Sequence, residues 1–317
     1  MSEVAPAASP IHLIVTCANR KKVVIPEGLR LGDLREYPPA ERFPVWAERL
    51  ATTTTLGIPA FDLYAGEHWQ AVRTLQQTVN DTASLWVCSA GYGLVPMDAD
   101  LAPYAATFAP GERDSAGSSL FAMREWWRQL TRWQWPAEYA PRSFADLARQ
   151  DPRATIIAVL SESYMRACAD DLREAATCLA DPEQFAILGP PNRCAELDKF
   201  VVPVTATLRP VVGGSMQALN VRAATHLLTL AGSNLGFSAL RKLAQESTES
   251  APPDPGRRPA GKKLNDHEVR NYIRQALGDG DGVGTATQLL RRLRSSGQSC
   301  EQARFHALFA EIRAEAV

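Results

Sequence analysis

The chain has 317 residues, of which 22% are charged, and its formal net charge is −1. A charge this close to zero excludes a basic field over the whole protein, so any affinity for nucleic acid must come from a local patch. As a prior, this length favours about two domains.

Six cysteines are scattered along the chain, without a CxxC pair and without a Cys/His spacing typical of zinc sites. They predict reduced thiols, no metal site and a cytoplasmic protein. The first residues, MSEVAPAASP, lack the basic and apolar regions of a signal peptide. No apolar run approaches the roughly 20 residues of a membrane span, so we expect no membrane partner.

Short apolar runs alternate with helical patterns along the first half of the chain. A buried strand is predicted over 11–16, and three cations follow it closely. Helices are predicted over 40–55 and 67–80, and a second buried strand over 85–88. Helical spacing returns over 117–135, where the aromatic band is more typical of a core than of a stacking platform.

The pattern continues to residue 245. A helical stretch ends near residue 179, and Ser215 is predicted to cap a later helix. The remaining strands are predicted over 154–160, 185–188, 200–204 and 208–212. Strands that alternate with helices predict an α/β domain over 11–245, with a mostly parallel sheet flanked by helices. Residues 1–10 are expected to be disordered.

A change of composition marks the end of this domain. Residues 246–263 are rich in Ser, Pro and Gly, which predicts a linker. Residues 264–317 are helical in pattern, with Gly297 at an expected helix end and Ser299 as the cap of the next helix. We expect a small all-α domain in which two helices resemble a helix-turn-helix, although such pairs also occur in proteins that do not bind DNA. Its basic cluster would contact phosphates and consists of Arg291, Arg292 and Arg294.

Several catalytic motifs are absent from the sequence. No glycine-rich loop ends in Gly-Lys-Ser/Thr, and the pair Gly91 and Gly93 lacks the third glycine of a dinucleotide fingerprint. The signatures of zinc proteases, α/β hydrolases and kinases are also missing. We therefore predict no cofactor.

Polar residues follow successive predicted strands, and such segments meet at the carboxyl edge of a parallel sheet. The cations after the first strand form either a solvated loop or a phosphate contact. The glycines after the second strand either permit a tight turn or let a ligand approach the backbone. The candidate residues are Cys17, Asn19, Arg20, Lys21, Lys22, Tyr64, Ser89, Gly91, Tyr92, Gly93, Asp98 and Tyr104.

The order of these segments resembles the YaaA family of peroxide-stress proteins, to which DpdC-type proteins of DNA deazaguanine modification are related. The resemblance covers about 11–170, roughly half the chain. It implies an unusual α/β fold, partly similar to uracil-DNA glycosylases, and association with nucleic acid or modified bases. The matching elements are Cys-x-x-x-Lys at 17–21, LYAG at 63–66, SAGYGLV at 89–95 with Asp98, PY at 103–104 and SESYMRA at 161–167.

With this family in view, Cys17 is the candidate nucleophile, and neighbouring cations would favour its thiolate. The alternative is a small buried residue at the end of a strand. Asp98 would act as a general base or hydrogen-bond a guanine-like edge. Tyr92 or Tyr104 would stack on a ring, while the glycines bring backbone amides close to it. Asn19, Tyr64 and Ser89 are expected to complete the substrate site.

Two functions of different classes follow from these residues. The first is a nucleic-acid-associated enzyme that acts on a nucleobase or nucleotide, such as a deazaguanine-type base in DNA. The second is a non-catalytic DNA-binding protein of stress response or phage defence. An enzyme predicts a deep pocket around Cys17, whereas a binder predicts a basic groove that joins 20–22 to the C-terminal arginines.

Overall fold

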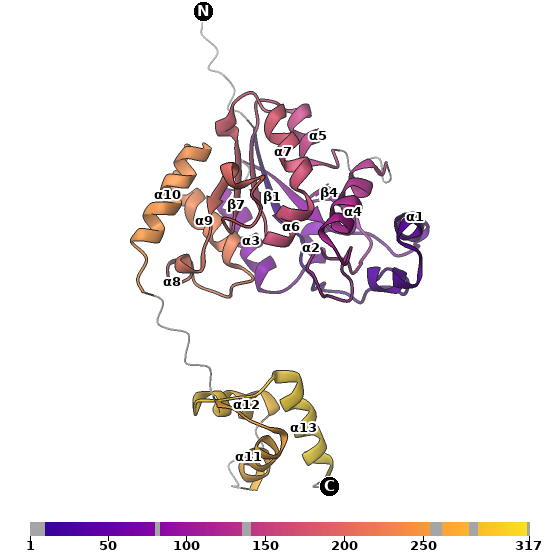
Figure 1. Cartoon of the computed structure of the whole chain (residues 1–317), viewed down its shortest axis with the longest axis vertical. Coiled ribbons are helices and arrows are strands. Elements are labelled where there is room, and N and C mark those ends of the chain that lie inside the picture. The colour runs from indigo at the N-terminus through magenta and orange to yellow at the C-terminus, as the bar shows by residue number, and fades with distance from the viewer. Residues whose placement is uncertain (1–9, 80–82, 135–140, 254–261, 279–284, 316–317) are drawn as a thin grey trace, which may run out of the picture. The chain divides into compact units, whose positions relative to one another are not determined.

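The computed structural model describes residues 10–79, 83–134, 141–253, 262–278 and 285–315, and it divides into two compact units (Figure 1). The units are Met1–Pro252 and Pro253–Val317, and each has its own apolar core. The predicted linker begins too early, because residues 246–249 complete helix α10 (Phe237–Glu249). Nearly all of the N-terminal segment predicted as disordered, and residues 254–261 of the predicted linker, lie outside the described residues.

The core of the large unit is a six-stranded sheet in the order β4-β3-β1-β6-β7-β8. All its pairings are parallel except that of β4 with β3. Runs such as IHLIVT and TIIAV are mostly apolar and are buried on both faces, as strands covered by helices on both sides require. The predicted α/β fold with a mostly parallel sheet is confirmed. The strands are β1 (Ile11–Thr16), β3 (Ser84–Ser89), β4 (Gly93–Pro96), β6 (Thr155–Val159), β7 (Phe185–Gly189) and β8 (Val201–Pro203).

Helices flank the sheet in two groups, which lie on opposite sides of β1 in Figure 1. On one side α3 (Glu67–Val79) packs against α9 (Leu219–Ala231), and α10 lies against β8. The other side carries α4 (Leu120–Arg132), α5 (Phe144–Gln150), α6 (Glu162–Ala167) and α7 (Ala169–Cys178). The strand order shows that the chain passes along the sheet in both directions from β1, and the right-handed crossovers that parallel strands favour then place helices on both faces. The short or peripheral elements before α4 are η1 (Leu31–Glu36), α1 (Pro39–Thr52), β2 (Ile58–Pro59), α2 (Ala60–Leu63) and β5 (Asp100–Leu101).

Two predictions about the segment before α9 are wrong. The strand predicted over 208–212 is instead the end of a 3₁₀ turn and the short helix α8 (Arg209–Val212). Pro210 favours this outcome, because proline lacks the N–H of a strand ladder and suits the first turn of a helix. Ser215 does not cap α9. Its N–H donates instead to the Glu67 carboxylate, at 2.7 Å.

The small unit contains α11 (Asp266–Gly278), α12 (Ala286–Ser295) and α13 (Gln302–Glu315). It is not purely helical, because the two-residue strands β9 (Lys262–Lys263) and β10 (Gln298–Ser299) pair in parallel. Gly297 follows the end of α12 with φ +79°, as predicted for a helix-ending glycine. Ser299 lies in β10 and does not cap α13.

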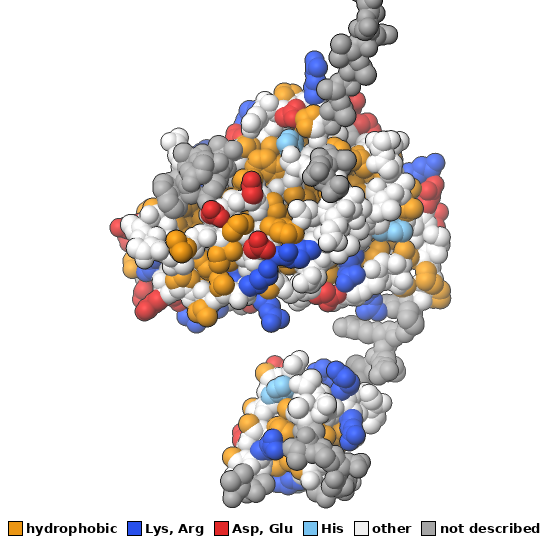
Figure 2. Space-filling view, turned by 180° about the vertical axis from the view of Figure 1, so that it is seen from behind, with side chains coloured by type: hydrophobic (Ala, Val, Ile, Leu, Met, Phe, Trp, Pro, Cys, Tyr) orange, Lys and Arg blue, Asp and Glu red, His pale blue; other side chains and the backbone are white. Residues whose placement is uncertain are grey.

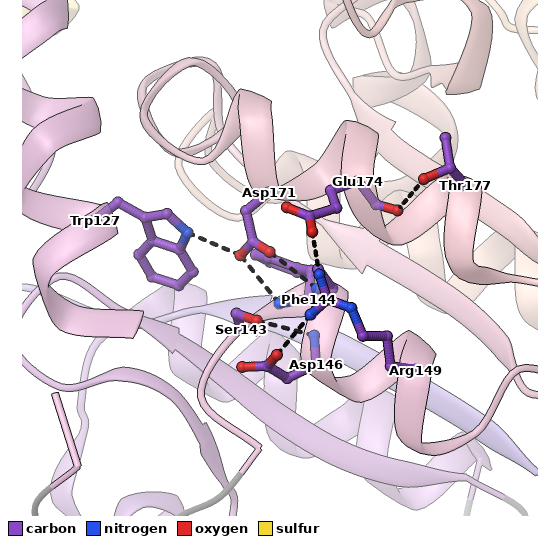
Figure 3. A network of polar contacts seen from close by, with 9 residues as sticks. Trp127, Ser143, Phe144, Asp146, Arg149, Asp171, Glu174 and Thr177 are labelled. Carbon is purple, nitrogen blue, oxygen red and sulfur yellow. Dashed lines mark hydrogen bonds and ion pairs between the residues drawn. The ribbon is translucent and has the colours of Figure 1, made fainter. Parts of the chain in front are cut away.

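One partly buried carboxylate joins the helices on the face of α4 to α7 (Figure 3). Asp171 accepts hydrogen bonds from the backbone N–H groups of Phe144 and Ala145, at 3.0 and 2.9 Å, and so caps α5. It also accepts the indole N–H of Trp127 at 2.9 Å. Burial raises the pKa of Asp171 to about 6, although these N–H donors stabilise the charged form.

We expect Asp171→Ala to lower the free energy of unfolding by about 2–4 kcal/mol, because it leaves buried N–H donors without an acceptor. Urea denaturation at neutral pH measures the change. Asp170→Ala is the matched control, because the neighbouring carboxylate is 65% exposed and should matter by less than about 0.5 kcal/mol. Equal losses in the two variants would contradict the capping role of Asp171.

Candidate functional site

A cavity of about 470 Å³ opens at the carboxyl edge of β1 and β6. Open α/β sheets bind ligands at this edge, and the volume lies within the range of small-molecule sites. The segment after β1 contributes Cys17, Asn19 and Arg20 to its lining. The cavity therefore collects part of the predicted constellation around Cys17.

Cys17 is fixed by both its backbone and its side chain. Its N–H donates to the carbonyl of Cys88 at 3.0 Å, which continues the pairing of β1 with β3. Its Sγ lies 3.1 Å from the hydroxyl of Tyr164 on α6. The residue is 7% exposed and lines the cavity, so it is held in one place and still faces the open space. A thiol in such a position can serve as a nucleophile towards a bound molecule.

His68 lines the same cavity, although its isolation in the sequence gives no reason to place it there. Its Nε2 lies 3.0 Å from the carbonyl oxygen of Thr16 and 3.3 Å from that residue's hydroxyl. Burial lowers the pKa of His68, so the imidazole is uncharged at neutral pH. The feature that could have located His68 is its position in the first turn of α3, which begins directly after Gly66. Gly66 has φ +95°.

The remaining walls carry amides and hydroxyls that were also not predicted from the sequence. Asn220, in the first turn of α9, donates to the carbonyl of Leu160 at 2.7 Å and lines the cavity. Gln217 and Thr107 line other parts of it. Ser161 and Ser163 complete the wall from the loop and first turn of α6. Such groups can donate to and accept from the edge of a heterocycle.

The three cations after β1 separate in the structure. Arg20 is exposed and lines the cavity, without an ion pair among the described residues. Lys22 is exposed and lies 3.6 Å from the carboxylate of Asp62. Lys21 turns inward: its ammonium donates to the carbonyl of Ala18 at 2.8 Å and lies over the rings of Tyr104 and Tyr64. The predicted phosphate contact of Lys21 therefore does not fit its position, because the aromatic faces and the carbonyl hold the amine inside.

The predicted substrate-binding residues Tyr64, Ser89 and Tyr104 lie together but do not line the cavity. The Tyr104 hydroxyl lies 2.6 Å from Ser89 Oγ and 2.8 Å from the Tyr64 hydroxyl. All three side chains are fully buried, and burial raises the pKa of both phenols. They form a layer beneath the loop after β1 and are not a stacking surface.

Tyr92, Gly91 and Gly93 belong to the same layer, contrary to the expected contact with a ligand. A Cβ at Gly91 would lie 2.5 Å from the Tyr104 ring, so the missing side chain makes room for that ring. Gly93 has φ +82°, which glycine adopts easily where β3 turns back into β4. The Tyr92 hydroxyl donates to the carbonyl of Ala102 at 3.2 Å. These positions serve packing and the turn.

Asp98 lies at the other end of the sheet, and its predicted catalytic role does not fit this position. The hairpin carries the chain back along β3, so that Met97 N–H donates to the Leu85 carbonyl near the start of that strand. Asp98 follows there as an exposed residue. The predicted constellation requires the segment after Gly93 to stay at the carboxyl edge, whereas β4 leads away from it.

Arg291, Arg292 and Arg294 belong to the small unit and are exposed on α12 or at its edge. Arg294 also donates to the carbonyl of Cys300 at 3.1 Å. Figure 2 shows a face of this unit on which Lys and Arg are more frequent than Asp and Glu.

The described residues contain no cluster of three or more His, Cys, Asp or Glu that could hold a metal ion. Among the helices within the described ranges, none is both long and apolar enough to cross a bilayer.

The buried amine of Lys21 predicts a pH dependence of stability. Burial lowers the pKa of Lys21 to about 8 from its ordinary value of 10.5. Between these values the unfolded chain holds a proton that the folded chain has released, so this contribution to the free energy of unfolding increases with pH. We expect the stability of the wild type relative to Lys21→Met to increase over this interval in urea titrations. Lys22→Met, which removes an exposed ammonium, is the control. The difference in the free energy of unfolding between the wild type and this variant should stay constant over the same pH interval. Parallel curves for the wild type and Lys21→Met would contradict the burial of the amine.

Comparison of the chain with family models, with curated proteins and with solved structures finds no match. The resemblance to the YaaA family and to uracil-DNA glycosylases therefore remains a prediction from the sequence.

Proposed function

We propose that the protein is a nucleic-acid-associated enzyme that acts on a nucleobase or nucleotide bound in the cavity at the end of β1. The observation that carries this proposal is the position of Cys17, whose thiol faces a polar cavity of about 470 Å³. Catalytic cysteines of this kind are partly accessible and lie beside polar or charged groups.

The lining supports a nucleotide more than an apolar ligand. The side chains of Asn19, Gln217 and Asn220 offer amide groups, which can pair with the donors and acceptors of a purine edge. Arg20, at the same cavity, offers a guanidinium that suits a phosphate. A ligand with a hydrogen-bonding heterocycle and a phosphate fits both features.

The chemistry we propose is addition of the Cys17 sulfur to the carbon of a nitrile on the base. The S–C bond forms as one C–N π bond breaks, and the nitrile nitrogen takes the proton of the thiol, which gives a thioimidate. Water then adds to this carbon and the thiol leaves with a proton, so that the base carries an amide and Cys17 is regenerated. The Tyr164 hydroxyl, 3.1 Å from Sγ, can hydrogen-bond to the thiolate. The resemblance of the sequence to DpdC-type proteins makes the nitrile of a deazaguanine-type base in DNA the first substrate to examine.

Nucleoside mass spectrometry of DNA and transfer RNA tests the proposal directly. We expect cells with the wild-type gene to differ in one modified nucleoside from cells that lack it. Cys17→Ser should give the deletion pattern, because serine is a far weaker nucleophile at neutral pH. Cys178→Ser, at a half-buried position on α7, is the control and should retain the wild-type pattern. A wild-type pattern in the Cys17→Ser strain would exclude Cys17 as the reacting group.

A second candidate is non-catalytic DNA binding by the small unit. The observation that favours it is the cluster Arg291, Arg292 and Arg294 on one helix. Accessible arginines on a compact helical unit suit the phosphates of a duplex.

The triple variant Arg291→Ala, Arg292→Ala, Arg294→Ala tests this second function. For the full chain on a short DNA duplex, the slope of log affinity against log salt should fall by roughly one for each phosphate that these arginines neutralise in the wild type. Arg128→Ala on α4, which removes an exposed arginine of the large unit, is the control. An unchanged slope in the triple variant would remove α12 from the DNA interface.

A further inference from the structure

A second cavity, of about 410 Å³, lies beside the one that contains Cys17. Pro110, Leu120 and Met123 give it an apolar wall, and Ser118 stands at its exposed side. The charged residues Glu162 and Arg166 also line it. An apolar wall with a polar rim suits the flat face of a ring. Nothing in the proposed chemistry uses this space.

The two cavities share one wall. Along residues 107–110 the chain alternates between them: Thr107 and Ala109 line the first cavity, and Phe108 and Pro110 line the second. Ser161 and Ser163 line both. The two spaces are therefore neighbours, and one ligand longer than a single nucleotide can occupy both.

Aromatic contacts connect the second cavity with the thiol. The Phe108 ring packs edge-on against the Tyr164 ring, with 5.1 Å between centroids. The Tyr164 hydroxyl in turn lies 3.1 Å from Cys17 Sγ. Phe108 is fully buried, so it holds the phenol that contacts the reacting group and offers no ring face to a ligand.

We propose that the two cavities bind consecutive nucleotides of one strand, with the reacting base beside Cys17 and the adjoining base against Pro110, Leu120 and Met123. This inference rests on the proposed function and specifies its substrate as at least a dinucleotide. Unstacked neighbouring bases that are held in separate pockets are a common mode of single-strand recognition.

Protection of Cys17 from iodoacetamide in the full-length protein, followed by peptide mass spectrometry, tests the inference. The probes are dGMP and the dinucleotides d(TpG) and d(GpT). We expect at least one dinucleotide to protect at a concentration about tenfold or more below that of dGMP, because it gains a second stacked base. Ser118→Trp, which fills the second cavity, should remove this advantage and leave protection by dGMP unchanged. Ser233→Trp is the matched control, an exposed serine in the loop before α10, and should keep the advantage.

The outcomes separate the inference from the function on which it rests. Equal protection by dGMP and both dinucleotides in the wild type would overturn the second subsite and leave the proposed function standing. A dinucleotide advantage that survives Ser118→Trp would also overturn the second subsite. A loss of dGMP protection in Ser118→Trp would overturn it too, because the two spaces would then not be separate subsites. Failure of all nucleotides to protect Cys17 would overturn the proposed function itself.

Discussion

A single buried phenol, that of Tyr104, ties together the segments that build the carboxyl edge of the sheet. Its hydroxyl lies within hydrogen-bond distance of both Ser89 and Tyr64, and its ring carries the Lys21 ammonium at 4.3 Å from its centroid. Buried polar groups that satisfy one another in this way fix the path of the chain, because each loses its partner if another moves. The loop after β1, and with it Cys17, therefore depends on a layer of side chains that does not line the cavity.

The five parallel strands of the main sheet could be predicted from the sequence, because their apolar, β-branched runs have few alternatives once helices cover both faces. The antiparallel strand β4 was not predicted. The run at 208–212 shows the limit of that argument, since Pro210 favours helix α8 in an apolar segment. The end of α10 shows another limit, because its last residues, Glu246 to Glu249, resemble a linker in composition, whereas Ser247 is buried and its hydroxyl lies 3.2 Å from His226 Nε2. Composition finds a domain boundary, but the packing of the last helix decides where it lies.

The site was predicted in part, for a physical reason. Residues directly after β1 reach the cavity because a parallel strand must release its chain at that edge, so Cys17, Asn19 and Arg20 were accessible to sequence reasoning. Tyr164 and His68 were not, because their places depend on how α6 and α3 pack against the sheet. Asp98 was expected at the carboxyl edge but lies at the other end of the sheet, because the sequence does not reveal that the glycine turn begins a hairpin. Residues that looked like ligand contacts, such as Tyr104, instead hold the edge together from below.

Photo-crosslinking with 6-thio-dGMP tests most directly whether this edge of the sheet is where a nucleotide binds. We expect crosslinked peptides of the full chain to contain residues 16–20, 66–68, 161–164 or 217–220, which surround the cavity, and unlabelled dGMP to compete with the reaction. Crosslinks confined to the small unit, or to the opposite edge of the sheet around Asp98, would contradict nucleotide binding at this edge.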